Sequence, residues 1–321
     1  MIPKRVLSGI QPSGDLHLGN YFGAIRQWVK LQEDHECFFF LADLHSLTSR
    51  KDAEALRHHN HEVTLTYLAC GLDPGKTVIF RQSDVPHHTE LAWILSTLCP
   101  MGLMERAHSY KDKVAKGMTA NVGLFTYPIL MAADILLYSA DLVPVGKDQK
   151  QHVEITRDLV DKFHTTFGEA FVVPDPFIPR EVAVVAGTDG QKMSKSYHNT
   201  IPIFADEKQL KKIIMGIITD STPLEGAKKA EGTTLFELYR LVAPKTADEF
   251  KDKLTGVGFG YGEAKKDLLL ATRSFLKPFL EKRRQLEARR GYIEEVLQDG
   301  AMKARAEAAK VMERVRGLVG L

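Results

Sequence analysis

The sequence predicts an α/β protein in which a doubly wound parallel sheet is followed by an α-helical C-terminal domain. Two observations support this prediction. Short apolar runs, typical of strands buried on both faces, alternate with segments of helical periodicity over the first half of the chain. Beyond residue 200 the periodicity is helical only.

The strands and helices of the first half alternate along the chain. Val6–Ile10 is the first apolar run, and Tyr21, Ile25, Trp28 and Val29 then recur on one face of a helix. The further predicted strands are 37–42, 77–80 and 142–145, and the further predicted helices are 54–70, 86–98, 123–138 and 149–163.

The second half is predicted to be a series of helices. Pro278 should kink or split the helix that contains it, because proline lacks an amide hydrogen and clashes with the preceding turn. The glycines between Gly256 and Gly262 could mimic a phosphate loop, but no strand leads into them, so they indicate a flexible connector. The predicted helices are 206–216, 234–242, 246–254, 264–288 and 300–318.

The composition excludes several classes of protein. Hydrophobic residues make up 44% and charged residues 26%, which is ordinary for a globular protein. No apolar run approaches the roughly 20 residues of a membrane helix, and the first residues lack the apolar core of a secretory signal. Cys37, Cys70 and Cys99 are widely spaced, so we expect free thiols, a cytoplasmic location and no membrane association.

Two clusters of histidines suggest a metal site. His58, His59 and His61 form one cluster, and His87 and His88 form the other. Neither has the spacing and the third ligand that a zinc site requires. We therefore expect surface histidines on helices and no zinc.

Positive charge is concentrated at the C-terminal end. The chain carries a net charge of +2, but residues 265–321 contain 14 Lys and Arg against 8 Asp and Glu. A basic segment on a near-neutral body suggests contact with a polyanion. A solvated helix face with scattered ion pairs is the alternative, and charge alone favours it.

A glycine turn follows the first predicted strand, in the segment from Gln11 to Asn20. A strand that leads through such a turn into a helix presents unpaired N–H groups and the positive end of a helix dipole, where phosphate binds. Gly19 permits close approach to a flat base, and His17 and Asn20 could donate to phosphate oxygens. Taken alone, Gly-Asn is more typical of a simple helix cap.

A basic pentapeptide, Lys192-Met193-Ser194-Lys195-Ser196, follows the turn Gly187–Gly190. Its two lysines are point charges on flexible stems, suited to a departing pyrophosphate, and its serines can donate to the same oxygens. The glycine turn would let the loop close over a ligand. Taken alone, this pentapeptide would be an ordinary solvated loop.

One predicted helix carries a carboxylate among apolar residues. Tyr127, Met131, Asp134 and Tyr138 share a helical stripe, and a carboxylate there is costly to bury unless something donates to it. An indole N–H, which only donates, is one candidate partner. An arginine or the backbone is the other, and the spacing does not decide between them.

These segments, together with Val143–His152, resemble the motifs of bacterial-type tryptophanyl-tRNA synthetases, which are class I aminoacyl-tRNA synthetases. The four motifs keep the family's order and spacing over nearly the whole chain. The resemblance implies ATP-dependent attachment of L-tryptophan to tRNA(Trp) through tryptophanyl-adenylate, with release of pyrophosphate and AMP, for protein synthesis.

The resemblance also implies a domain organisation. Residues 1–200 would form a Rossmann-like catalytic domain with a dimer-interface insertion at about 85–140, and 201–321 a helical anticodon-binding domain. The last helix could pack back on the catalytic domain. The expected assembly is a homodimer, and the expected partner of the basic C-terminal helices is tRNA(Trp).

Site residues follow from the resemblance residue by residue. Catalysis would depend on Lys192, Lys195, Gln11 and Asn20. The implied tryptophan pocket consists of Asp134 as the acceptor of the indole N–H, Tyr127 and Gln149 at the α-ammonium, and Met131, Val143, Val145, His45, Gly9 and Leu7. The implied ATP-binding residues are Gln11, Pro12, Ser13, Gly19, Asn20, Gly146, Lys147, Asp148, Val185, Lys192, Met193, Ser194, Lys195 and Ser196.

The implied cofactor is ATP with Mg²⁺, which would accompany the phosphates. Some relatives hold an iron–sulfur cluster through C-terminal cysteines, but no cysteine follows Cys99, so we expect no cluster. Two positions depart from the family's usual pattern. Lys147 stands where relatives commonly carry an acidic residue, and Leu7 stands where a phenylalanine often lines the pocket. Asn20 stands where many relatives have a histidine, but Gly-Asn is itself a variant that the family contains.

Two other functions compete with tryptophan charging. A tyrosine-specific or other adenylyl-transferring enzyme of the same fold would lack the Asp134 stripe or the long basic tail. A non-catalytic RNA-binding paralogue should have lost the lysines or the glycine turn, and this chain keeps both.

Overall fold

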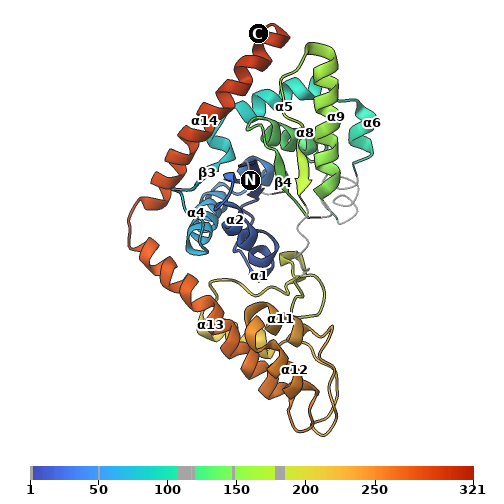
Figure 1. Ribbon diagram of the computed structural model, residues 1–321, viewed down its shortest axis with the longest axis vertical. Coiled ribbons are helices and arrows are strands. Elements are labelled where there is room, and N and C mark those ends of the chain that lie inside the picture. The colour runs from blue at the N-terminus through green and yellow to red at the C-terminus, as the bar shows by residue number, and fades with distance from the viewer. Residues whose placement is uncertain (1–2, 50, 108–116, 118–119, 147–148, 178–184) are drawn as a thin grey trace. The chain divides into compact units, whose positions relative to one another are not determined.

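The computed structural model describes residues 3–49, 51–107, 117, 120–146, 149–177 and 185–321 (Figure 1). The chain forms two compact units. The sheet unit comprises Met1–Gly14, Trp28–Glu181 and Arg289–Leu321, and the helical unit comprises Asp15–Gln27 and Val182–Ala288. The units therefore divide the chain at other places than residue 200. The last helix belongs to the sheet unit, and the segment with the basic pentapeptide belongs to the helical unit.

A five-stranded parallel sheet forms the centre of the sheet unit. Its strand order is β3-β2-β1-β4-β5, so the direction of winding reverses between β1 and β4 and the predicted doubly wound sheet is confirmed. Leu7 pairs with Phe38 across β1 and β2, and Phe38 pairs with Val78 across β2 and β3. The strands are β1 (Arg5–Ile10), β2 (Glu36–Leu41), β3 (Thr77–Arg81), β4 (Leu142–Pro144) and β5 (Asp175–Phe177).

Four of these strands match the predicted apolar runs, whereas β5 was not predicted. It has only three residues, it contains Pro176, and it lies at the edge of the sheet. Proline cannot donate to a neighbouring strand and is tolerated at such edges, so the sequence of β5 carries no strand signal.

Helices cover the sheet and form the core with it. Buried aromatic and aliphatic residues of β1, β2 and β3 pack in one cluster with apolar residues of α5, α8, α9 and α14. The helices of this unit are α2 (Arg26–Leu31, which begins in the helical unit), α3 (Asp43–Ser46), α4 (Ala53–Ala69), the 3-10 turn η2 (Gln82–Asp84), α5 (His87–Leu98), α6 (Met101–Glu105), α8 (Val122–Leu136), α9 (Lys150–Phe167) and α14 (Tyr292–Val319).

The long C-terminal helix α14 lies against the edge strand β3 (Figure 1). Ion pairs connect α14 to β3 and to α5. Glu294 accepts two hydrogen bonds from Arg81 at 3.1 and 2.6 Å, and Arg316 donates to Glu90 of α5 at 2.7 and 2.6 Å. The helix begins eight residues before its predicted start at Gly300, because that glycine lies inside the helix rather than at its end.

The helical unit is built on α13 (Tyr261–Glu287). Pro278 lies inside this helix and does not split it. Phe275 of α13 stacks on Phe22 and meets Tyr21 edge-on, which places the start of the chain's first helices against α13. The other elements are α1 (Leu18–Asn20), the π-helix η1 (Tyr21–Ile25), η4 (Lys195–Tyr197), α10 (Glu207–Met215), α11 (Thr234–Val242), η5 (Pro244–Thr246) and α12 (Ala247–Thr255).

Candidate active site

Asp134 lies in the last turn of α8, is 1% exposed, and is surrounded by hydrogen-bond donors. His45 Nε2 is 2.7 Å from Oδ2, and Gln82 Nε2 donates to Oδ1 at 2.6 Å. The Nδ1 of His88 is also 2.6 Å from Oδ1. These partners come from α3, η2 and α5, so Asp134 has internal partners, as the alternative to an indole expected, but they are histidine and glutamine side chains and not an arginine or the backbone.

The surroundings of Asp134 favour its ionised form. Burial raises the pKa of a carboxyl group, but the interaction with His45 and the hydrogen bonds from His45 and His88 outweigh it and lower the pKa of Asp134 to about 2. Burial, together with the charge of Asp134, raises the pKa of Tyr138 well above its usual range, so its hydroxyl keeps the proton. Asp134 is therefore a buried, charged acceptor.

Tyr127 lies two turns before Asp134 on the same helix and is buried. Its hydroxyl is 2.8 Å from His152 Nε2, and its ring meets the ring of His45 edge-on at a centroid distance of 6.2 Å. His45, Tyr127 and Asp134 thus lie together, as the family resemblance implies. Gln149 is the residue before the first turn of α9, and its backbone N–H donates to the carbonyl of Gly146 at 2.9 Å.

The apolar residues predicted for the pocket belong to one core cluster. Leu7 of β1 and Val143 of β4 are buried in it, and Met131 and Val145 are half-buried against it. Gly9 is needed in β1 because a Cβ there would lie 2.8 Å from the carbonyl oxygen of Phe40. The cluster therefore brings strands β1 and β4 and helix α8 to the same place.

Three residues of this region were not predicted from the sequence. His88 was assigned to the surface, which was wrong, because it is fully buried and contacts Asp134. Its signal was available, since His88, Leu91 and Leu95 share one apolar face of α5. Gln82 and His152 carried no pattern of their own. Among the described residues, no group of three or more His, Cys, Asp and Glu could hold a metal ion.

Residues 15–20, at the end of the segment that follows the first strand, lie in the helical unit. The basic pentapeptide Lys192–Ser196, called the lysine loop below, folds against them there. The amide of Gly19 is 3.3 Å from the sulfur of Met193, and a Cβ on Gly19 would lie 2.9 Å from the ring of His17. The Asn20 side-chain oxygen accepts a hydrogen bond from the backbone N–H of His17 at 3.1 Å. Asn20 therefore does cap the helix, and the contact of Gly19 with Met193 joins the two predicted motifs. The cap does not exclude a phosphate site.

Asn199 fixes the shape of the lysine loop. Its side chain donates to Asp189 Oδ1 at 2.7 Å and to the carbonyl of Lys192 at 3.1 Å, and it accepts from the amide of Ser194 at 2.8 Å. Gly187 has no room for a side chain, because a Cβ would lie 2.2 Å from the same asparagine. The loop is thus a preformed turn and not a loose segment.

The two lysines of the loop differ in their surroundings. Lys192 is exposed and Lys195 is half-buried at the start of η4. Burial and the charge of Lys195 lower the pKa of His17 to about 4, so this imidazole is neutral at physiological pH. Ser194 accepts from the amide of Ser196 at 3.3 Å, and the carbonyl of Val185 accepts from the amide of Met193 at 2.8 Å.

The remaining predicted ATP residues lie in the sheet unit. Gln11, Pro12 and Ser13 follow directly after β1, where the winding of the sheet reverses and where ligands bind in α/β proteins. Gly146 follows β4 and is half-buried. Lys147 and Asp148 lie outside the described residues.

Residues 2–277 match the family model described as tRNA synthetases class I (W and Y), and the chain therefore belongs to this family of aminoacyl-tRNA synthetases. It is 52% identical to a tryptophan–tRNA ligase of Fusobacterium nucleatum, over 99% of this chain and 98% of that one. It is 51% identical to a tryptophan–tRNA ligase of Rhodopirellula baltica, over 99% of each chain.

A solved structure of the tryptophanyl-tRNA synthetase of Campylobacter jejuni, in complex with ADP and tryptophan, superposes with a TM-score of 0.94. That protein is 49% identical to this one, over 99% of this chain and 100% of the other. In the described part of the chain, no helix has the length and apolar character needed to cross a membrane.

Proposed function

We propose that this protein attaches L-tryptophan to tRNA(Trp) with ATP as the energy source, through a tryptophanyl-adenylate. The observation that carries the proposal is the buried, ionised carboxylate of Asp134, which is held by His45, Gln82 and His88. A buried acceptor selects for a ligand that brings a donor, because a ligand without one leaves the carboxylate incompletely paired. The names of the full-length relatives support the same substrate.

The tryptophan pocket is proposed to lie around Asp134. Its carboxylate would accept the indole N–H, while Tyr127 and Gln149 hold the α-ammonium and His45 lies near the ring. Tyrosine would be excluded by shape and by the position of its hydroxyl, and phenylalanine by its lack of a donor. The apolar residues proposed to pack against the indole are Leu7, Gly9, Met131, Val143 and Val145.

The chemical step needs no nucleophilic side chain. The tryptophan carboxylate would attack the α-phosphorus of ATP, the bond to the β,γ-pyrophosphate would break, and the adenylate would remain for attack by a terminal ribose hydroxyl of tRNA. Gln11 and Ser13 are proposed to orient the α-phosphate, and His17 and Asn20 to donate to the phosphates. Positioning and charge stabilisation then supply most of the rate enhancement.

The lysine loop is proposed to hold the leaving pyrophosphate. Lys192 and Lys195 would balance its developing charge, and Ser194 and Ser196 would donate to its oxygens. Mg²⁺ would enter with the ATP phosphates and share their charge, since this ion usually keeps several waters and one or two carboxylate ligands. The residues proposed to contact adenine and ribose are Pro12, Gly19, Gly146, Lys147, Asp148, Val185 and Met193.

The tRNA is proposed to contact exposed basic residues of the C-terminal segment. Lys282, Arg284 and Arg290 are exposed and make no ion pair with the described residues. By contrast, Arg316 is paired with Glu90, and Arg305 donates to the carbonyl of Asp84 at 2.6 Å. The charges of the first three residues are therefore available for phosphates. The charging of tRNA is proposed to take place in the cytoplasm.

A homodimer is proposed from the exposed apolar residues of the 85–140 region. Trp93 of α5 is 72% exposed, Met101 of α6 is 65% exposed and Val122 of α8 is 77% exposed. Helix α8 contacts both α5 and α6, and large exposed apolar side chains on neighbouring helices are typical of a surface that another protein covers. A second copy of this chain is the proposed partner.

The experiment that tests the function is ATP–pyrophosphate exchange measured with each of the twenty amino acids in turn. We expect exchange with tryptophan and little with tyrosine or phenylalanine. Exchange with tyrosine alone would support the related tyrosine enzyme, and no exchange with any amino acid would support the non-catalytic alternative.

A further inference from the structure

The two oxygens of Asp134 are not equally occupied. Oδ1 receives the Gln82 amide and the Nδ1 of His88, both at 2.6 Å, whereas from the described residues Oδ2 receives only the Nε2 of His45 at 2.7 Å. An ionised carboxylate has about four acceptor positions, two on each oxygen. Oδ1 is therefore saturated, and one acceptor position of the carboxylate remains, on Oδ2.

His88 holds its place through a second buried hydrogen bond. Its Nε2 is 2.8 Å from the hydroxyl of Tyr138, which keeps its proton and so donates to that nitrogen. A neutral imidazole that accepts at Nε2 carries its hydrogen on Nδ1, which faces Asp134. Tyr138 thus fixes the tautomer of His88 that donates to Oδ1.

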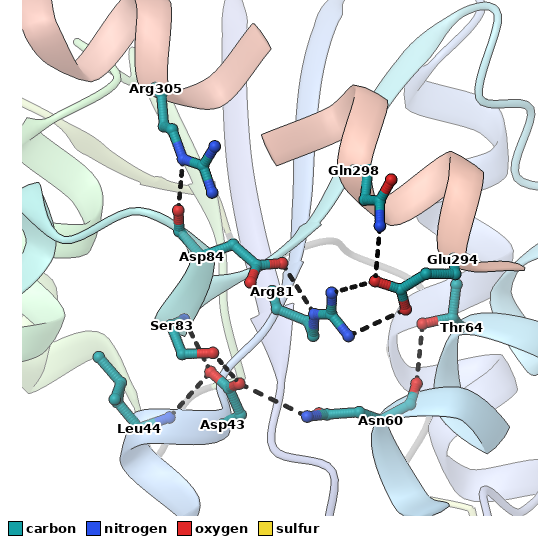
Figure 2. A network of polar contacts seen from close by, with 10 residues as sticks. All are labelled: Asp43, Leu44, Asn60, Thr64, Arg81, Ser83, Asp84, Glu294, Gln298 and Arg305. Atoms are coloured by element: carbon teal, nitrogen blue, oxygen red, sulfur yellow. Dashed lines mark hydrogen bonds and ion pairs between the residues drawn. The ribbon is translucent and has the colours of Figure 1, made fainter. Parts of the chain in front are cut away.

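The residues before and after Gln82, which are Arg81 and Ser83, are held by polar contacts (Figure 2). The preceding Arg81 pairs with Asp84 at 2.7 Å and with Glu294 of α14, and the following Ser83 donates its backbone and side-chain hydrogens to the buried Asp43 at 3.0 and 2.5 Å. These contacts hold the backbone on both sides of Gln82, and from this position its side chain reaches Asp134 Oδ1 at 2.6 Å.

The side-chain oxygen of Gln82 indicates that the contact between Gln82 and Asp134 serves ligand binding and not the stability of the fold. Gln82 is fully buried, and its Oε1 has no hydrogen-bond partner among the described residues. A buried acceptor without a partner is unfavourable, so the fold alone does not account for a glutamine at this position. Residues that break such a local rule are typical of functional sites.

We propose that Gln82 and the Tyr138–His88 pair are positioning residues that determine specificity for tryptophan. They hold Oδ1 of Asp134, so that the free acceptor position on Oδ2 is presented to the indole N–H. The inference rests on the proposed function, because it requires tryptophan to bind at Asp134. It assigns roles to residues that do not need to touch the substrate.

The test compares two buried glutamines of the same unit. Gln82→Met removes the donor to Asp134, and Gln32→Met is the control. Gln32 is also buried, but it donates to the carbonyl of Gly71 and accepts from the amide of Asp73, both at 3.0 Å. ATP–pyrophosphate exchange is measured for each variant with tryptophan and with an analogue in which sulfur replaces the indole N–H.

We expect the wild-type protein to prefer tryptophan over the sulfur analogue, and this preference in kcat/KM to fall about tenfold in Gln82→Met, as for the loss of one hydrogen bond to a charged group. The preference should be unchanged in Gln32→Met, and the KM for ATP should be unchanged in both variants. An undiminished preference in folded Gln82→Met would overturn the inference.

A second pair of variants covers the case in which Gln82→Met does not fold. Tyr138→Phe removes only the hydroxyl that fixes His88, and Tyr67→Phe removes another fully buried hydroxyl in the same unit. The preference should fall in the first and stay in the second, and an equal preference in both would overturn the role of the Tyr138–His88 pair. If the wild type shows no exchange with tryptophan at all, the proposed function fails instead.

Discussion

Gly300 of α14 touches the backbone of Ile79 in the edge strand β3. A Cβ on Gly300 would lie 1.8 Å from the Ile79 carbonyl oxygen, so helix and strand approach at a distance that only glycine permits. This contact covers an edge strand, which would otherwise be open to pairing with other chains.

Gly300→Ala should therefore destabilise the protein, by about 3 kcal/mol because the backbone must move apart. The matched control is Gly317→Ala on the same helix, where a Cβ meets nothing within 4 Å. That change should stabilise the protein by up to about 1 kcal/mol through helix propensity. Urea unfolding of both variants measures the difference, and equal stabilities would contradict the close packing.

The pKa of His17, lowered to about 4 by burial and by Lys195, predicts a pH dependence. The unfolded chain binds a proton near pH 6.5 and the folded chain only near pH 4, so the free energy of unfolding should fall as the pH falls through this window, by about 3 kcal/mol. His17→Gln should remove this part of the slope.

The pKa of His17, compared between the wild-type protein and a Lys195 variant, separates the effect of burial from the effect of the Lys195 charge. In Lys195→Ala the His17 pKa, followed by NMR titration, should rise but stay below 6.5, because burial is the larger cause. A His17 pKa near 6.5 in the wild-type protein would contradict the buried position of this ring.

Lys195→Ala should slow ATP–pyrophosphate exchange on the order of 10²-fold, because one cation that balances the leaving pyrophosphate is lost. Tryptophan affinity, measured by equilibrium dialysis, should stay nearly unchanged. Lys208→Ala is the control, since Lys208 is an exposed lysine of α10 in the same unit. Normal exchange in Lys195→Ala would remove this lysine from the mechanism.

Trp93→Glu should shift the proposed homodimer toward monomer, because it places a charge in the middle of an apolar surface. Light scattering after size-exclusion chromatography gives the mass at each concentration. Met302→Glu is the control, because Met302 is 60% exposed on α14, outside the 85–140 region. A wild-type protein that is monomeric at micromolar concentration would contradict the proposal.

Much of the fold could be predicted because its strands are continuous apolar runs, such as Cys37–Leu41, and its helices have strong periodicity. What could not be predicted depends on contacts across the chain. Gly300 resembles a helix start in sequence, and only its approach to Ile79 explains a glycine inside α14.

Some residues of the candidate site could likewise be predicted from the sequence, and others could not. Asp134 could be predicted because a carboxylate on an apolar stripe is a conflict visible in the sequence. Gln82 could not, because a single glutamine after a strand has no pattern, and its meaning comes from a partner 52 residues away. His88 was misassigned because a pair of histidines was judged by metal spacing and not by the apolar face that it shares with Leu91 and Leu95.

The central claim is that Asp134 accepts the indole N–H of tryptophan. The most direct measurement compares kcat/KM in ATP–pyrophosphate exchange for tryptophan and for phenylalanine, in the wild type and in Asp134→Ala. The preference for tryptophan should be on the order of 10⁴-fold in the wild type and should largely vanish in the variant. A folded Asp134→Ala protein that keeps its preference for tryptophan would contradict the account.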